Sequence, residues 1–160
     1  MASAKQLSSR LREVFLSGTW IANTNWQHQI MQINCEEAVT KIGSLNTIAS
    51  LTYHINYYMA GVLQVLQGGT LDIHDKYSFD FIPPQTEEEW KGMKNNLFSN
   101  AEDFAICVEQ LSEENLEAVF TDEKYGTYRR NIEAMIEHAY YHLGQVSLIR
   151  KMIKESVLRY

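Results

Sequence analysis

The amino-acid sequence predicts an all-α protein, a four-helix bundle with a long crossover between its second and third helices. Apolar residues recur at three- and four-residue spacing along four long segments, and no segment shows the alternating pattern of a half-buried strand. Gly68-Gly69 and Pro83-Pro84 interrupt the pattern, so the chain between them cannot be regular helix. A chain of 160 residues with 45% hydrophobic content can bury one continuous core, which predicts a single domain over residues 1–160.

The first helix is predicted to begin at Ser3, where Ser3-Ala-Lys-Gln6 has the pattern of a capping box, and to end at Gly18. One face of this helix carries Leu7, Leu11, Val14 and Phe15. Residues 18–44 give mixed signals, with one short helix expected near residues 24–33 and with Trp20, Ile21 and Trp26 as apolar anchors.

The second helix is predicted over residues 45–66 and ends at Gly68-Gly69. Its apolar positions are Ile48, Leu51, Ile55, Tyr58, Val62 and Val65. No residue from 42 to 71 is charged, but polar residues, including His54, are scattered through this stretch. These residues favour a helix buried in the protein over a membrane span.

The third helix is predicted to begin after Thr86, because Thr86-Glu-Glu-Glu89 has the pattern of a second capping box. Its buried seam comprises Trp90, Met93, Leu97, Ala101, Phe104, Val108 and Leu111. A turn-rich stretch over 112–126 leads to the fourth helix, from 127 to about 157. Near its C-terminus this helix carries cations that interact favourably with the negative end of the helix dipole: Arg150, Lys151, Lys154 and Arg159.

Charge and cysteine content narrow the classes of function. The net charge of −6 and the dispersal of the 14 Lys and Arg residues argue against a nucleic-acid surface. Cys35 and Cys107 belong to no C-x-x-C pair, so inert, reduced thiols and a cytoplasmic location are expected. The N-terminus has no apolar segment typical of a secretory signal.

Three histidines form the candidate site. His138 and His142 lie four residues apart on one helix, so their side chains differ by roughly 40° in direction and about 6 Å along the axis. His54 lies at the edge of the apolar face of the second helix and also turns inward. Three imidazoles from two helices would bind a divalent metal ion and leave a coordination position open for solvent or substrate. The alternative is a set of hydrogen-bonded core histidines, because the spacing lacks the Glu of H-E-x-x-H.

The context of these histidines resembles the DinB/YfiT-like family. The motifs are Leu51-Thr-Tyr-His54 in an uncharged helix, Gly68-Gly69 after it, and His138-Ala-Tyr-Tyr-His142-Leu-Gly144-Gln145, and the resemblance covers nearly the whole chain. It implies a four-helix bundle, a homodimer, and nickel, zinc or a similar ion on the three histidines. Some members of the family are thiol S-transferases that use a low-molecular-weight thiol such as bacillithiol or mycothiol, others are isomerases or hydrolases, and many have no assigned activity. A metal-dependent thiol S-transferase is the activity expected from the resemblance.

Metal coordination favours the thiolate, which would attack a small electrophilic substrate. A hydrolase would use a metal-activated water instead, but spacing places no carboxylate in the site, which disfavours that alternative. A non-catalytic stress-response or binding module with a structural metal is the third interpretation. No catalytic residue is assigned.

Several residues near the predicted site have two interpretations. Gln145 could hydrogen-bond a ligand or simply pack between helices. The tyrosines at 57, 58 and 141 are possible hydrogen-bond donors or core residues. Asp72-Ile-His74-Asp75 is expected to be a solvated loop rather than a second metal cluster.

Overall fold

The structure is a computed structural model that describes residues 1–157, with side chains through residue 155. Its regular structure in this range is helical, and the only β-type pairing there is an isolated bridge between Val119 and Thr127. The predicted all-α class is therefore confirmed. None of the helices in the described range is long and apolar enough to cross a membrane.

The first helical segment follows the prediction closely. Helix α1 (Ala4–Arg12) continues into one π-helical turn, η1 (Glu13–Ser17), and the chain leaves helical geometry at Gly18. The capping box at Ser3 is complete, because the Ser3 side chain accepts the Gln6 amide and the Gln6 side chain accepts the Ser3 amide. The four predicted apolar residues of this segment are fully buried.

Residues 18–44 form two short helices where one was expected. Helix α2 (Trp26–Ile30) is capped by Asn25, and helix α3 (Cys35–Val39) begins with an Asn-x-x-Glu capping box that the sequence interpretation missed. Trp26 is buried as predicted, but Trp20 is 85% exposed and Ile21 is also exposed, so the prediction that they anchor the core was wrong. The next two residues, Ala22 and Asn23, both have positive φ, in a turn whose apolar side chains face solvent.

Helix α4 (Ile48–Leu66) begins three residues later than predicted, because Thr47 is the N-cap. It ends as the glycine pair predicted. Gly68 has a φ of +86°, and the amides of Gly68 and Gly69 donate to the carbonyls of Val65 and Gln64. This is the left-handed helix ending that glycine tolerates best.

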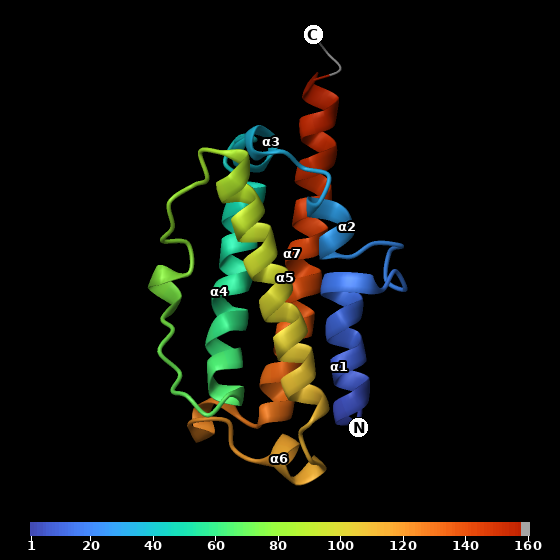
Figure 1. Ribbon diagram of the computed structural model, residues 1–160, viewed down its shortest axis with the longest axis vertical. Coiled ribbons are helices and arrows are strands. Elements are labelled where there is room, and N and C mark those ends of the chain that lie inside the picture. The colour runs from blue at the N-terminus through green and yellow to red at the C-terminus, as the bar shows by residue number, and fades with distance from the viewer. Residues whose placement is uncertain (158–160) are drawn as a thin grey trace.

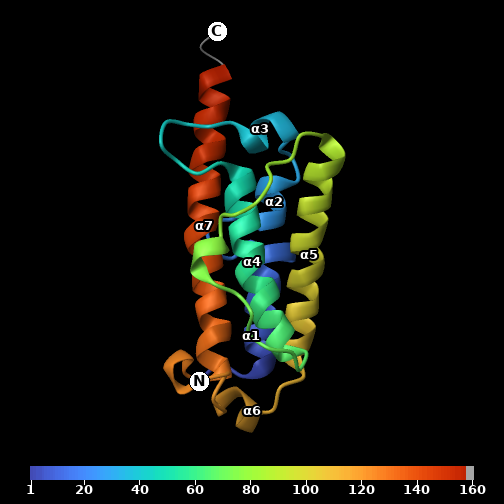
Figure 2. The same cartoon turned by 90° about the vertical axis from the view of Figure 1, so that its left-hand side faces the viewer.

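A long connection over residues 67–86, here called the crossover, joins α4 to α5 (Glu87–Glu109) and contains the single turn η2 (Asp75–Tyr77). It runs back along α4, so that α4 and α5 point in the same direction, as the green and yellow segments of Figures 1 and 2 show. Thr86 caps α5 as predicted, but Glu89 accepts from the amide of Gln85 instead of closing a reciprocal box with Thr86.

The remaining elements are α6 (Glu113–Glu117), the turn η3 (Glu123–Tyr125) and the 30-residue helix α7 (Tyr128–Val157). Lys154 lies in the last turn of α7, whereas Arg159 falls outside the described residues. Segments α1, α4, α5 and α7 lie side by side, with α1 and α7 running opposite to α4 and α5 (Figures 1 and 2). The largest side chains of the buried core between them are Trp26, Trp90, Phe15 and Phe104.

Candidate metal centre

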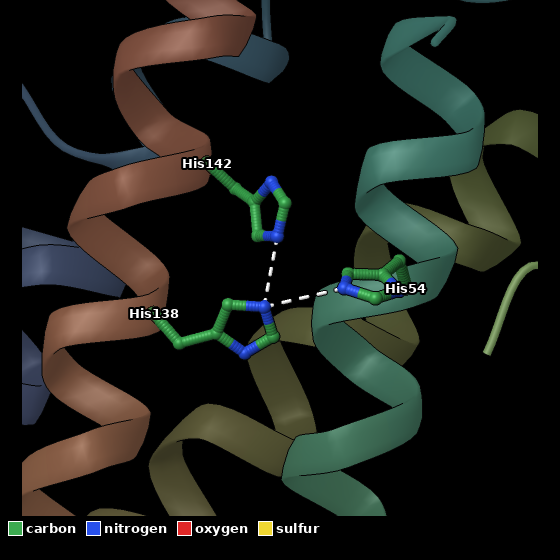
Figure 3. A group of neighbouring side chains, drawn as sticks. All are labelled: His54, His138 and His142. Atoms are coloured by element: carbon green, nitrogen blue, oxygen red, sulfur yellow. Dashed lines mark hydrogen bonds between the residues drawn. The ribbon is translucent and has the colours of Figure 1, made fainter. Parts of the chain in front are cut away.

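The structure brings the three predicted histidines together. His54 comes from α4, and His138 and His142 come from successive turns of α7, the helix beside it (Figure 3). The Nε2 atom of His138 lies 3.2 Å from Nε2 of His54 and 2.8 Å from Nε2 of His142. The three ligand atoms all lie within 4.8 Å of one another, and among the described residues this is the one such group of histidine, cysteine and acidic side chains.

Two of the three imidazoles are buried, and the third is half-buried. His54 is 8% exposed and His142 is 6% exposed, while His138 is half-buried. Fully buried neighbours on the same helices, such as Ile55 and Ala139, hold these faces of α4 and α7 against the core. The three rings point toward one another from the two helices, as Figure 3 shows.

Two of the rings are oriented by hydrogen bonds at their outer nitrogens. Nδ1 of His54 lies 3.3 Å from the carbonyl oxygen of Ser78, and Nδ1 of His142 lies 2.7 Å from Oε1 of Gln145. Because these oxygens can only accept, each Nδ1 carries the hydrogen and donates it. The Nε2 lone pairs of His54 and His142 are therefore directed inward, as in metal sites whose imidazoles are held from behind.

The convergence of these nitrogens is compatible with a metal site. A proton on Nε2 of His138 could be donated to only one of its two neighbours, which would leave the other lone pair facing a nitrogen. For metal–nitrogen bonds of about 2.05 Å, adjacent ligand nitrogens lie about 3.3 Å apart in a tetrahedron and about 2.9 Å apart in an octahedron. Two of the three separations, 3.2 Å from His54 to His138 and 2.8 Å from His142 to His138, are close to these spacings, and all three nitrogens lie within 4.8 Å of one another.

The electrostatic environment keeps the histidines neutral. Burial, followed by the nearby charges of His142 and His54, lowers the pKa of His138 to about 4. Burial is also the main cause that lowers the pKa of His54 and of His142. The unprotonated imidazole, which is the form that binds a metal, therefore predominates at neutral pH.

Aromatic rings surround the histidines. Phe79 of the crossover stacks on His54 with ring centroids 4.1 Å apart, and the ring of Tyr58 meets His54 and His138 edge-on at 5.0 and 5.3 Å. Tyr141 contacts His142 at 5.0 Å but is 65% exposed. These rings shield the imidazoles and form the apolar part of their surroundings.

The hydroxyls of the predicted tyrosine donors bind mainly to the crossover. Tyr57 accepts the amide of His74 and donates to its carbonyl, and Tyr58 donates to Oδ1 of Asp75 at 2.9 Å. The 72–75 segment, which was expected to be a solvated loop, is exposed at its tip but is attached to α4 through His74 and Asp75. Sequence reasoning missed Ser78 and Phe79 and placed Asp75 in a solvated loop, because no local pattern indicates that a loop will fold back onto a particular turn of helix.

Gln145 has a double role. Its carbonyl oxygen accepts from His142, which confirms that it binds a predicted ligand residue. The same side chain lines a cavity of about 220 Å³ between the start of α4 and α7. The cavity lining comprises Ser44, Leu45, Asn46, Leu51, Gln145, Leu148 and Ile149. Gln145 thus connects this partly apolar cavity with the outer side of the His142 ring.

The other singled-out residues take no part in the site. Cys35 and Cys107 are free thiols, and burial raises the pKa of each, which agrees with the prediction that they are inert. His28 pairs with the hydroxyl of Thr24 and is not a member of the cluster.

Comparisons of the chain with protein-family models, with curated proteins and with solved structures found no significant match. Function must therefore be inferred from the histidines and their surroundings.

Proposed function

We propose that this protein binds one divalent metal ion through the Nε2 atoms of His54, His138 and His142, and that the ion's remaining coordination positions accept a small molecule. The observation that supports this most directly is the convergence of three imidazole nitrogens, two on buried histidines and one on the half-buried His138. The lone pairs of the two buried histidines are directed inward by hydrogen bonds on the opposite side of the ring. Three protein ligands are fewer than zinc or nickel requires, which is typical of a reactive rather than a structural site.

The donor set narrows the choice of metal without settling it. Neutral imidazole suits zinc, nickel, copper and iron, whereas magnesium and calcium prefer oxygen ligands. Nickel or zinc is proposed, because the DinB/YfiT-like resemblance implies these ions. The same resemblance supports a four-helix bundle of that family, with the crossover between its second and third long helices.

The activity we propose is transfer of a low-molecular-weight thiol to an electrophilic substrate. A metal ion held by the histidines would favour the thiolate form of a bound thiol. The protein's own contribution is positional. Gln145 and Ser78 orient the imidazoles, Phe79 and Tyr58 limit the access of water, and the cavity beside Gln145 offers room for the apolar part of a substrate.

Hydrolysis is the second candidate, and Asp75 is the observation that favours it. The crossover carries this carboxylate to the hydroxyl of Tyr58, whose ring touches two of the histidines. However, within the described chain no carboxylate hydrogen-bonds or pairs with an imidazole of the cluster, so no general base is placed directly at the site. Thiol transfer therefore remains the preferred proposal, with a non-catalytic metal-binding module as the outcome if no turnover is found.

A homodimer is also proposed, on the basis of the resemblance and of exposed apolar side chains. Tyr141, Leu148 and Met152 follow one another at spacings of seven and four residues on the outer face of α7, and Trp20 projects from the turn before α2. Light scattering on purified protein would give the mass of two chains if this is correct.

Elemental analysis tests the metal site. Protein purified without a histidine tag and reconstituted with zinc or nickel should retain about one ion per chain. His138→Ala should abolish retention, while His28→Ala and His74→Ala serve as matched controls and should leave it unchanged. Retention by His138→Ala equal to that of the unmodified protein would refute the site.

Thiol transfer is tested separately with metal-loaded protein, bacillithiol or another low-molecular-weight thiol, and a monochlorobimane-type electrophile. Turnover should be lost on chelation and restored by the metal. Turnover that is insensitive to chelation would exclude the proposed transferase while leaving the metal site intact.

A further inference from the structure

The crossover is attached to the same face of α4 that carries His54. Tyr57 exchanges two hydrogen bonds with the backbone of His74, and Tyr53 stacks on Phe81 with ring centroids 5.0 Å apart. Between these two points the crossover supplies both the carbonyl of Ser78 and the ring of Phe79 to His54. The segment over residues 74–81 therefore forms one wall of the histidine cluster.

The hydrogen bond between Tyr58 and Asp75 lies at the centre of this attachment. The Tyr58 ring packs against His54 and His138, while its hydroxyl donates to Oδ1 of Asp75 at 2.9 Å. Asp75 is the first residue of η2, and that single turn leads directly to Ser78. A contact between Tyr58 and Asp75 thus sets where η2 lies and, through η2, where the Ser78 carbonyl meets Nδ1 of His54.

Besides the hydrogen bond from Tyr58 to Asp75, side-chain contacts from Tyr57 to the His74 backbone and from His54 to Phe79 hold this part of the crossover. Residues 74–77 are all exposed, whereas Ser78 is buried. Ile73, one residue before this segment, packs against the backbone of α4 at Gly61, where a Cβ atom would approach the Ile73 side chain to 2.6 Å. A short, exposed segment held by a few side-chain hydrogen bonds belongs to the least stable parts of a fold, so that single contacts can control its closure.

We propose that Tyr58 and Asp75 are positioning residues of the metal centre, which hold the crossover closed over the histidines and thereby couple its closure to metal occupancy. This inference rests on the proposed metal site. Closure places an acceptor behind His54 and so favours the imidazole orientation that binds the ion. By thermodynamic linkage, a bound ion must then stabilise the closed crossover by the same factor by which closure strengthens metal binding.

Limited proteolysis of the full chain measures this coupling, because Lys76 is an exposed trypsin site within η2. The cleavage rate after Lys76 is followed by mass spectrometry in the chelator-treated protein and in the same protein with Zn²⁺. The ratio of the two rates within each variant is the readout. Because both rates are measured on the same variant, any direct effect of the substitution on cleavage by trypsin cancels in the ratio. His138→Gln lacks one of the three histidines and gives the ratio expected without metal binding.

The unmodified protein should be cleaved more slowly with Zn²⁺ by about tenfold or more. Tyr58→Phe, which keeps the ring, and Asp75→Asn should each reduce this protection about three- to tenfold. The loss is limited to this range because Asp75 is exposed, so that water can take the place of its hydrogen-bond partner. Asp72→Asn removes the same charge from the crossover, but Asp72 binds Gln64 and Thr70 rather than Tyr58, so its protection should be unchanged. The zinc affinity of Tyr58→Phe, from chelator competition, should fall by the same factor as its protection.

Three results would overturn the coupling. The first is a bound zinc ion with no slowing of cleavage at Lys76. The second is a Tyr58→Phe variant that behaves like Asp72→Asn. The third is an unmodified protein that retains no zinc, and only this result also removes the proposed metal site, so the two failures are distinguishable.

Discussion

Replacement of Gln145 by Leu should weaken metal binding by about tenfold. The Gln145 oxygen accepts from Nδ1 of His142 at 2.7 Å, and His142 is 6% exposed. Loss of an acceptor from a buried donor costs about 1–3 kcal/mol, which corresponds to about 5- to 150-fold in an equilibrium constant. Gln145 itself is only half-buried and lines the cavity of about 220 Å³, so water can replace part of the lost hydrogen bond. The effect should therefore fall near the lower end, about tenfold.

The assay is competition for Zn²⁺ against a chromogenic chelator, with Gln145→Glu as the matched variant. Glutamate keeps an acceptor oxygen at the same reach and adds a charge that favours the Nδ1–H tautomer, so its affinity should equal or exceed that of the unmodified protein. Equal affinities for the Leu and Glu variants would refute the idea that the amide orients His142. Unchanged thermal unfolding of both metal-free variants would show that the fold is intact.

Three further predictions concern stability. The pKa of His138 is lowered to about 4 in the folded protein, so between about pH 6.5 and pH 4 the unfolded chain binds more protons. In denaturant titrations of the metal-free protein, the free energy of unfolding should therefore decrease as the pH is lowered through this range. His138 contributes less than about 1.4 kcal/mol per pH unit to this decrease, so the decrease should be smaller in His138→Gln. Arg129 is 5% exposed and binds Glu113 and Glu117 of α6, so Arg129→Met should cost about 2–3 kcal/mol in the same titration; a loss below about 0.5 kcal/mol would contradict this role. Gly68→Ala places a side chain at a φ of +86° and should cost about 1 kcal/mol, detectable as a lower melting temperature, whereas an unchanged value would mean that the helix end adjusts.

Sequence reasoning succeeded where the determinants are local. The capping residues Ser3 and Thr86 and the glycine pair after α4 act on backbone groups within a few positions, so the helices they bound could be predicted to within about three residues. The same reasoning missed α3, whose Asn34 capping box lies in a stretch of weak periodicity. It also misplaced Trp20, because hydrophobicity alone does not reveal that the following turn directs a side chain outward.

The sequence by itself determined the all-helical class, the inward orientation of the three histidines and the spacing that puts two of them on one helix face. Only the tertiary structure decided that Nε2 of His54 lies 3.2 Å from Nε2 of His138, although the two residues are 84 positions apart in the sequence. It also decided that the crossover supplies Ser78, Phe79 and Asp75 to the same place. The physical reason is range: helix periodicity and caps depend on neighbours along the chain, whereas contacts between α4, α7 and the crossover depend on how separate elements pack. The assignment to a DinB/YfiT-like family stays a prediction, which metal analysis and thiol-transfer assays can test.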